Sequence, residues 1–202
     1  MDVRAYKDKT TPLKGEVMDI GATCYHRFLE GDNSGLEQLV EMYNSSLVFY
    51  INGLVNNVAT AEDIAADTFV ELLVKKSSFK NDYAFKTWLF RVARNNSIDY
   101  LRKQARIGTF AIDDCGSQLL DSQNLEKAII QSEQHMQMHQ AMKLLNNDYR
   151  DVLHLVCLEG LSYDQAGVVL KKNTKQIKNL VYRARQALKL EMERKGFIYE
   201  NL

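Results

Sequence analysis

The stretch AFKTWLFRVARNNSIDYLRKQAR, residues 84–106, decides how this chain is organised. At helical spacing its apolar residues share one side, which consists of Phe85, Leu89, Val92, Ala93 and Tyr100. The roughly opposite side is mostly cationic and holds Thr87, Arg91, Arg94, Ile98 and Arg102. Trp88 and Asn95 lie between the two sides. Such a helix suits a nucleic acid with exposed bases; the alternative is a solvated amphipathic helix with a core tryptophan.

The charges are balanced in number but unevenly distributed. The 202 residues include 26 acids and 26 bases, so the formal net charge is zero. Residues 80–106 and 171–195 are rich in lysine and arginine, whereas residues 107–135 are acidic. This pattern predicts two basic patches separated by an acidic linker.

Composition favours an all-α protein of the cytoplasm. There is one proline and little strand-like alternation. The three cysteines are odd in number and widely spaced, which is typical of reduced thiols. Because no run reaches transmembrane length and no signal peptide opens the chain, we expect a cytoplasmic protein without membrane insertion. No four-ligand metal set is recognisable, so we expect neither metal nor cofactor.

Helical periodicity divides the chain into two small helical domains. We expect an N-terminal extension over 1–20, a first domain over 21–106, a flexible acidic linker over 107–127 and a helix-turn-helix domain over 128–202. Within the first domain, Gly31-Asp32-Asn33 separates a short helix from a long one.

A helix starting at Thr60, its expected N-cap, has two unlike faces. One face is suited to a core and consists of Ile64, Ala65, Thr68, Phe69 and Leu72. The other interleaves acids with aliphatics, namely Asp63, Asp67, Val70, Leu73 and Val74. This predicts a helix held on both sides, by its own domain and by a basic, partly apolar partner helix. The alternative is a fully buried helix with acids at its rim.

Two capping boxes mark a helix-turn-helix. Ser162 with Gln165 opens a short helix, and Asn173 with Gln176 opens a long basic one. The long helix turns a regular apolar stripe inward, formed by Ile177, Val181, Ala184 and Leu188. Its outward side chains suit base edges and phosphates and comprise Lys175, Gln176, Lys178, Asn179, Tyr182 and Arg183. The alternative is an ordinary basic surface helix.

Four motifs in this order resemble the small two-domain sigma factors of bacterial RNA polymerase, the extracytoplasmic-function (ECF) group of the sigma-70 family. They are FLEGDNSGLEQLVEMY (28–43), AEDIAADTFVELL (61–73), FKTWLFRVARNNSIDYLRKQAR (85–106) and LSYDQAGVVL with TKQIKNLVYRARQALK (161–170 and 174–189). The resemblance implies core polymerase and promoter DNA as partners and leaves open whether an anti-sigma factor binds. It implies a non-enzymatic initiation subunit, and the chain has no phosphate loop, nucleophile elbow or paired-carboxylate site.

The resemblance also assigns residues. Core polymerase would meet Glu62, Asp63, Asp67, Val70, Leu73 and Val74. The minus-ten element would meet Phe79, Lys80, Asn81, Tyr83, Trp88, Arg91, Arg94, Asn95 and Arg102. The minus-thirty-five element would meet Lys171, Lys172, Lys175, Gln176, Lys178, Asn179 and Arg183.

Four positions depart from the family pattern. Ala66 stands where glutamine is usual, and Leu180 where arginine is frequent. Gly167 replaces an alanine and Lys171 the turn glycine, which puts the helix-turn-helix angle in question. Two other functions therefore stay open: a stand-alone helix-turn-helix regulator, and a polymerase-binding relative that acts by protein contact alone.

Overall fold

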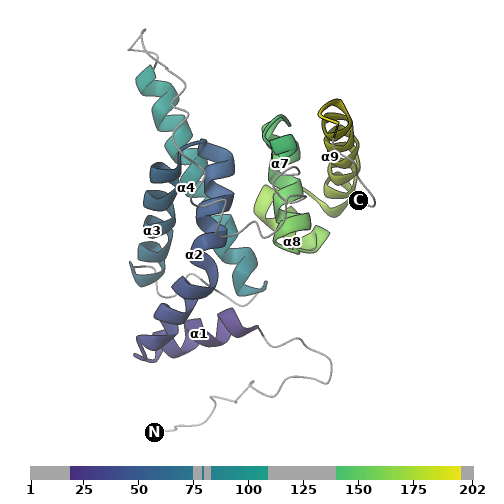
Figure 1. The fold of residues 1–202 in the computed structure, drawn as a ribbon. Coiled ribbons are helices and arrows are strands. Elements are labelled where there is room, and N and C mark those ends of the chain that lie inside the picture. The colour runs from purple at the N-terminus through teal and green to yellow at the C-terminus, as the bar shows by residue number, and fades with distance from the viewer. Residues whose placement is uncertain (1–18, 75–78, 80–82, 109–139, 197–202) are drawn as a thin grey trace, which may run out of the picture.

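The computed structural model describes residues 19–74, 79, 83–108 and 140–196. Within these ranges the regular secondary structure is helical, without strands, and the helices form two groups along the chain (Figure 1). The all-α, two-domain prediction is therefore confirmed. The expected extension lies outside the described residues except for its last two, and the linker except for residues 107 and 108. The exact domain boundaries stay a prediction.

The N-terminal domain consists of α1 (Ile20–Leu29), α2 (Ser34–Val55), α3 (Val58–Val74) and α4 (Phe85–Gly108). The expected break between the first two helices is confirmed, and Gly31 makes it with a φ of 100°. The C-terminal domain consists of α7 (Asn147–Leu153), the π-helix η1 (His154–Leu158), α8 (Tyr163–Leu170) and α9 (Thr174–Arg194).

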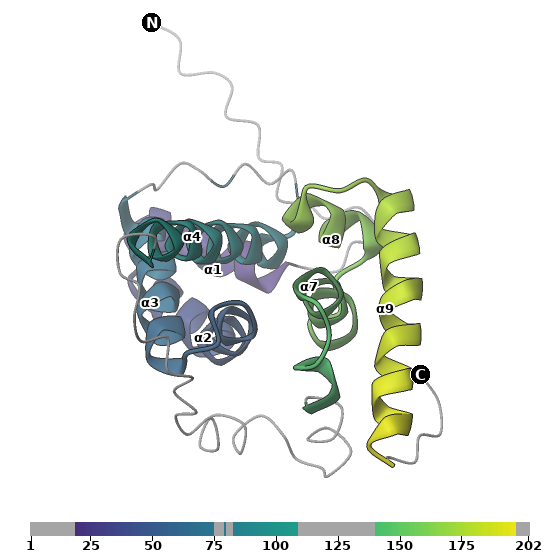
Figure 2. The ribbon, with the colours of Figure 1, turned by 90° about the horizontal axis from the view of Figure 1, so that it is seen from above.

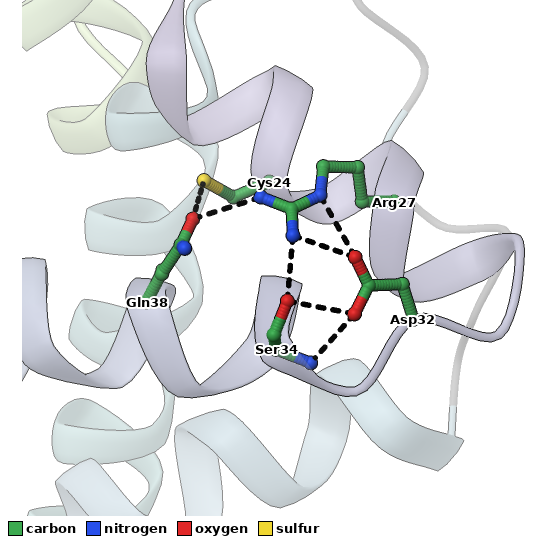
Figure 3. Close-up of polar contacts among 5 residues, drawn as sticks. All are labelled: Cys24, Arg27, Asp32, Ser34 and Gln38. Carbon is green, nitrogen blue, oxygen red and sulfur yellow. Dashed lines mark hydrogen bonds and ion pairs between the residues drawn. The ribbon is translucent and has the colours of Figure 1, made fainter.

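The elbow between α1 and α2 is held by close backbone packing and an arginine (Figure 3). Arg27 donates from Nε and Nη2 to Asp32 Oδ2, at 2.9 and 2.6 Å, and from Nη2 to Ser34 Oγ at 2.6 Å. A Cβ on Gly35 would lie 2.3 Å from the carbonyl oxygen of Cys24. Glycine is therefore required where α2 crosses α1, and this crossing positions the rest of the N-terminal domain.

The two domains pack against each other. In the view from above, α7 lies beside α2 and α8 beside one end of α4, whereas α9 lies on the outer side of the C-terminal domain (Figure 2). The predicted helix-turn-helix therefore meets the N-terminal domain through its first helix and leaves its second helix on the outside.

Candidate functional site

The start of α3 differs from the sequence prediction. The helix begins at Val58, and the side-chain oxygen of Asn57 accepts the Thr60 amide at 2.9 Å. Asn57 is therefore the N-cap, and the prediction of Thr60 was wrong because Thr60 is itself the third residue of the helix. Asn56, in a left-handed conformation with φ 57°, ends α2 just before this cap.

The two faces of α3 are as unlike in the structure as in the sequence. The predicted core face is buried throughout: Ile64, Ala65, Thr68, Phe69 and Leu72. On the other face Val70, Leu73 and Val74 are 50%, 40% and 75% exposed. The acids Glu62, Asp63 and Asp67 are exposed beside them. The alternative of a fully buried helix is therefore wrong, and α3 presents a free acid–aliphatic surface.

Trp88 belongs to the core of the N-terminal domain. It is 5% exposed, and its ring centroid lies 5.7 Å from those of Phe85 and Phe79 and 6.0 Å from that of Tyr25. The prediction that it lies at the seam of the helix is corrected, because α1 and the residue at 79 cover that edge of α4. A contact between this ring and a DNA base would require Trp88 to leave the cluster.

The cationic side of α4 is not one open stripe. Arg94 Nε donates to Asp151 Oδ2 at 2.8 Å, and Arg102 forms an exposed pair with Asp99 at 3.2 Å. Thr87, predicted on this side, is fully buried, which corrects its expected exposure. Arg91 is half-buried. Two of the three arginines on this side, Arg94 and Arg102, are therefore engaged in ion pairs.

The minus-ten candidates outside the arginines are divided between core and surface. Phe79 is half-buried in edge contact with the rings of Tyr25 and Phe85. Tyr83 is 45% exposed, and Asn95 is half-buried. Lys80 and Asn81 lie outside the described residues. Among the described candidates, Tyr83 offers the most accessible ring for stacking.

Both capping boxes of the helix-turn-helix are formed. The Ser162 and Asn173 side chains accept the amides of Gln165 and Gln176, at 3.2 and 2.9 Å. In the reverse direction, Gln165 Oε1 accepts the Ser162 amide at 2.8 Å and Gln176 Oε1 accepts the Asn173 amide at 2.9 Å. The cap therefore occupies one acceptor position of Gln176 Oε1 and leaves its Nε2 group to donate to DNA. This limit on a predicted base reader was missed in the sequence.

The rest of α9 follows the prediction. Ile177, Val181, Ala184 and Leu188 are buried. Its outward residues are exposed: Lys175, Gln176, Lys178, Asn179, Tyr182 and Arg183. In the turn before α9, Lys171 is exposed and Lys172 half-buried. Lys171 takes the left-handed conformation of the missing glycine, with φ 55°. The turn thus forms despite the departure from the family pattern.

A buried polar contact between the domains was not predicted. Asp151 on α7, 3% exposed at its side chain, accepts the Tyr50 hydroxyl at 2.5 Å and Arg94 Nε at 2.8 Å. Burial and the Asp151 carboxylate raise the pKa of Tyr50 well above its usual value. Burial alone would lower the pKa of Arg94, but the neighbouring carboxylate raises it. Asp151 therefore joins a charged, closed network across the two domains.

A second acid reaches α4 from just beyond η1. Glu159 lies 2.8 Å from Lys86 Nζ and 3.3 Å from His154 Nε2. Burial would raise the pKa of Glu159, but hydrogen bonds and charge from His154 and Lys86 lower it overall. The His154 ring packs on Phe49 and Tyr50 of α2, with centroids 5.1 and 5.0 Å apart. No local pattern signals the contacts across the domains. Lys86 lies 73 residues from Glu159, and Arg94 and Tyr50 lie 57 and 101 residues from Asp151.

Nothing in the described part of the chain forms a helix of the length and apolarity that a bilayer crossing requires. In the same residues, no three side chains of His, Cys, Asp or Glu gather as ligands for a metal ion.

Two family models match this chain. One is Sigma-70 region 2, over residues 39–107, and the other is Sigma-70, region 4, over residues 135–188. The first covers most of the N-terminal domain, and the second covers the helix-turn-helix.

Similar proteins agree with both matches. The ECF RNA polymerase sigma factors SigW and SigM of Bacillus subtilis are 28% and 29% identical to this chain. The alignments cover 81% and 76% of this chain and 91% and 93% of those proteins. The sigma factor RpoE of Bartonella quintana, solved with the anti-sigma factor NepR, superposes with a TM-score of 0.60 at 25% identity, covering 78% of this chain and 96% of that one. CnrH, solved with the cytosolic domain of CnrY, shares the fold with a TM-score of 0.62 at 21% identity, over 87% and 98% of the two chains.

Proposed function

Because this chain belongs to the sigma-70 family and is an RNA polymerase sigma factor of the ECF type, we propose that three of its helices divide the work of initiation. In this assignment α3 binds core polymerase, α4 with the residues before it acts on the minus-ten element, and α9 reads the minus-thirty-five element. The observation that carries the assignment is the order of the two matched regions along a fold in which α3, α4 and α9 each keep exposed side chains.

Polymerase docking on α3 is supported by its exposed aliphatics. Val70, Leu73 and Val74 expose apolar surface beside Asp63 and Asp67. An apolar centre rimmed by acids is complementary to a basic, partly apolar helix. Ala66 is exposed on the same face, so the missing glutamine would alter the contact without disturbing the core.

Minus-ten recognition is supported by two kinds of side chain on α4 and just before it, cationic ones for the DNA backbone and base-contacting ones. Arg91 and Arg102 provide cations for a backbone, while Tyr83 and Asn95 provide a ring and an amide for a base. A stacking side chain reaches a base only when the duplex is open. This surface therefore fits single-stranded promoter DNA inside the polymerase complex better than free duplex.

Minus-thirty-five recognition is supported by the outer face of α9. The amides of Gln176 and Asn179 and the lysine Lys175 lie near the N-terminal end of the helix, where a recognition helix enters the major groove. Lys178 and Arg183 are exposed for phosphates.

The assigned role also determines where the chain works and which partners it has. A sigma factor works with RNA polymerase in the cytoplasm, and the core polymerase supplies the chemistry, so we assign this chain no enzymatic activity. An anti-sigma factor is a further partner, supported by the likeness to RpoE, which was solved with one.

Reconstitution tests the assignment. The purified chain is mixed with core polymerase and a promoter library in duplex and pre-melted forms, and transcripts are sequenced. Promoter-directed transcription that requires both the minus-ten and the minus-thirty-five element supports the proposal. Binding to polymerase without directed transcription would instead favour a relative that acts by protein contact alone.

A further inference from the structure

Helix α4 begins after a residue that cannot cap it. Ala84 directly precedes the helix, and its carbonyl oxygen accepts the Trp88 amide at 3.2 Å, so Ala84 occupies the N-cap position. Alanine has no side-chain oxygen for the amides of the first turn, which lack partners within the helix, and it is a poor N-cap. A side-chain acceptor for these amides must therefore come from another part of the chain.

Asp19 supplies this acceptor from 66 residues away. Its Oδ2 accepts the Phe85 amide, the first of α4, at 2.6 Å. Its Oδ1 accepts the Ala22 amide at 3.0 Å and so caps α1. The amides and the dipole at the beginning of a helix both favour a negative charge there. One carboxylate thus caps α1 and joins its beginning to that of α4, and the two helix ends lie close together in Figure 1.

The beginning of α1 is also packed closely on α4. A Cβ added to Gly21 would lie 2.8 Å from Cδ1 of Phe85 and 2.7 Å from the hydroxyl oxygen of Tyr43. Glycine within a helix is less favourable than alanine, and here the close approach requires it. Burial, together with the nearby Asp19 charge, raises the pKa of Tyr43 to about 12, so its hydroxyl stays neutral beside the carboxylate. The hydrogen bond from Phe85 to Asp19 is therefore part of a tightly packed junction.

This junction holds the chain at the point where a minus-ten candidate projects from it. Tyr83 lies two residues before Phe85 and is 45% exposed. Phe85 is fully buried, and its ring centroid lies 5.4 Å from those of Tyr25 and Phe79. Because both the ring and the amide of Phe85 are held, the backbone leading back to Tyr83 has a fixed direction. A ring that is already in place loses less conformational entropy when it binds a ligand.

We propose that Asp19 is a positioning residue for minus-ten recognition, which holds the beginning of α4 so that Tyr83 is presented to an unpaired base. The inference rests on the proposed function, because it takes Tyr83 as a residue that stacks on DNA. It gives a role to the end of the segment that the sequence predicts to be an N-terminal extension.

The variant Asp19→Ser separates the two contacts of this carboxylate. Serine is about as good an N-cap as aspartate and keeps the cap of α1, but its single, shorter side-chain oxygen leaves the Phe85 amide without this acceptor. The matched control is Asn57→Ala, which removes the N-cap of α3 in the same domain. Amide hydrogen exchange at Phe85, followed by NMR, should become faster in Asp19→Ser and stay unchanged in the control.

The functional test uses each chain assembled with core polymerase and a single-stranded oligonucleotide of the minus-ten element. Each base in turn is replaced by an abasic site. The ratio of the affinities for the intact and the abasic oligonucleotide measures how much binding gains from that base. Stacking on one aromatic ring is worth about 5- to 150-fold in this ratio. A variant that is merely less stable would weaken binding of all oligonucleotides alike and leave the ratios unchanged.

The base that Tyr83 contacts is the one whose ratio is lost in Tyr83→Ala. At this base we expect Asp19→Ser to lower the ratio close to the Tyr83→Ala value, and Asn57→Ala to keep the wild-type ratio. Asp19→Ser should lower the ratio no further when it is combined with Tyr83→Ala, because both changes act through the same ring. A wild-type ratio in Asp19→Ser, an equal loss in the control, or a further loss in the combined variant would overturn the inference.

A second variant decides should Asp19→Ser lose helix content by circular dichroism. Asp19→Asn keeps the shape of the side chain and the Oδ1 cap of α1, and it places an N–H donor where Oδ2 accepted the Phe85 amide. It must lower the ratio at the same base. An unchanged ratio in Asp19→Asn would refute the role of Asp19.

The inference and the proposed function fail differently. If only the inference is wrong, Tyr83→Ala loses the ratio at one base while the Asp19 variants keep it. If Tyr83→Ala leaves every ratio unchanged, the proposed minus-ten role of Tyr83 is wrong, and the positioning role of Asp19 is wrong with it.

Discussion

The carbonyl oxygen of Lys172 lies so close to Gly167 that a Cβ added to the glycine would be 2.6 Å from it. The same turn carries Lys171 in the left-handed region, at φ 55°. Two departures from the family pattern thus act together: a glycine in α8 makes room for the turn, while a lysine adopts the strained conformation. The helix-turn-helix is retained with its glycine in another place.

We expect Gly167→Ala to lower the free energy of unfolding of the C-terminal domain by about 1–3 kcal/mol, because a backbone carbonyl cannot yield as a side chain would. Lys171→Gly should raise it by between about 0 and 1.6 kcal/mol. It relieves about 1–2 kcal/mol of left-handed strain and gives back roughly 0.4–1 kcal/mol in unfolded-chain entropy. Urea unfolding followed by circular dichroism measures both.

Lys172→Gly is the control for the turn, since its φ is not positive and glycine relieves nothing there. It should be destabilising. Equal gains from the two lysine variants would show that the left-handed strain at Lys171 is negligible.

Local features of this fold were predictable from sequence, and contacts between distant segments were not. Both capping boxes were read correctly, because the paired residues are three apart and each pattern contains its own partner. The start of α3 was misplaced by choosing Thr60 over Asn57. Both residue types are good N-caps. Thr60 lies three residues after Asn57, at the position whose amide the true cap accepts.

Periodicity also could not predict the burial of residues at the margin of the apolar side of α4. Trp88 lies about 100° from the centre of the apolar side, at the limit where burial depends on neighbours. Tyr25 and Phe79 cover it, the first from α1 and the second from just before α4. The ion pair of Arg94 with Asp151 spans 57 residues and two domains, so no pattern in α4 announces it.

The α3 surface gives the clearest test of polymerase docking. Asp67→Arg with Leu73→Glu should abolish co-purification with core polymerase while helix content stays unchanged, because both side chains are exposed and neither supports the core. Pull-down with tagged polymerase and circular dichroism measure the two effects.

The matched control is Glu41→Arg with Met42→Glu on α2, which alters an exposed acid and a 42% exposed aliphatic side chain in the same way. It should leave co-purification intact. Full recovery of the α3 variant with polymerase would place docking elsewhere.

On α9 we expect the salt dependence of DNA binding to distinguish residues that read bases from residues that contact phosphates. Asn179→Ala should change the preferred bases at its position, at a cost of about 1–3 kcal/mol for the matched base. Lys178→Ala should weaken all sequences alike and reduce the salt slope by about 0.9. Binding selections by the holoenzyme on randomised upstream elements at two salt concentrations measure both changes.

Gln176 needs a variant that spares the cap. Gln176→Glu keeps a side-chain oxygen for the Asn173 amide and replaces the Nε2 donor with an oxygen of a charged carboxylate, whereas alanine would lose the capping box as well. Unaltered consensus sequences with both Gln176→Glu and Asn179→Ala would mean that another face of α9 meets the groove.

The last prediction concerns the melted promoter. Extruding a base costs a few kcal/mol, and stacking on an aromatic ring returns about 1–3 kcal/mol. The free chain therefore gains little from duplex DNA, and polymerase contacts must supply the difference. Tyr83→Ala and Asn95→Ala should lower initiation on duplex and pre-melted templates alike, because base reading itself is lost. Arg91→Ala should instead impair initiation in proportion to salt.

If the aromatic cluster has a structural role, substitutions of Phe79 and Trp88 should affect stability, unlike those of Tyr83 and Asn95. Their alanine variants should lower the free energy of unfolding of the N-terminal domain, by about 3–5 kcal/mol for the buried Trp88 and by less for the half-buried Phe79. Permanganate footprinting, run beside thermal unfolding, separates the two cases. Stable Tyr83 and Asn95 variants that open and transcribe promoters at wild-type levels would remove these residues from base recognition. A Trp88 variant that remains fully stable but fails on pre-melted templates would return its ring to the DNA.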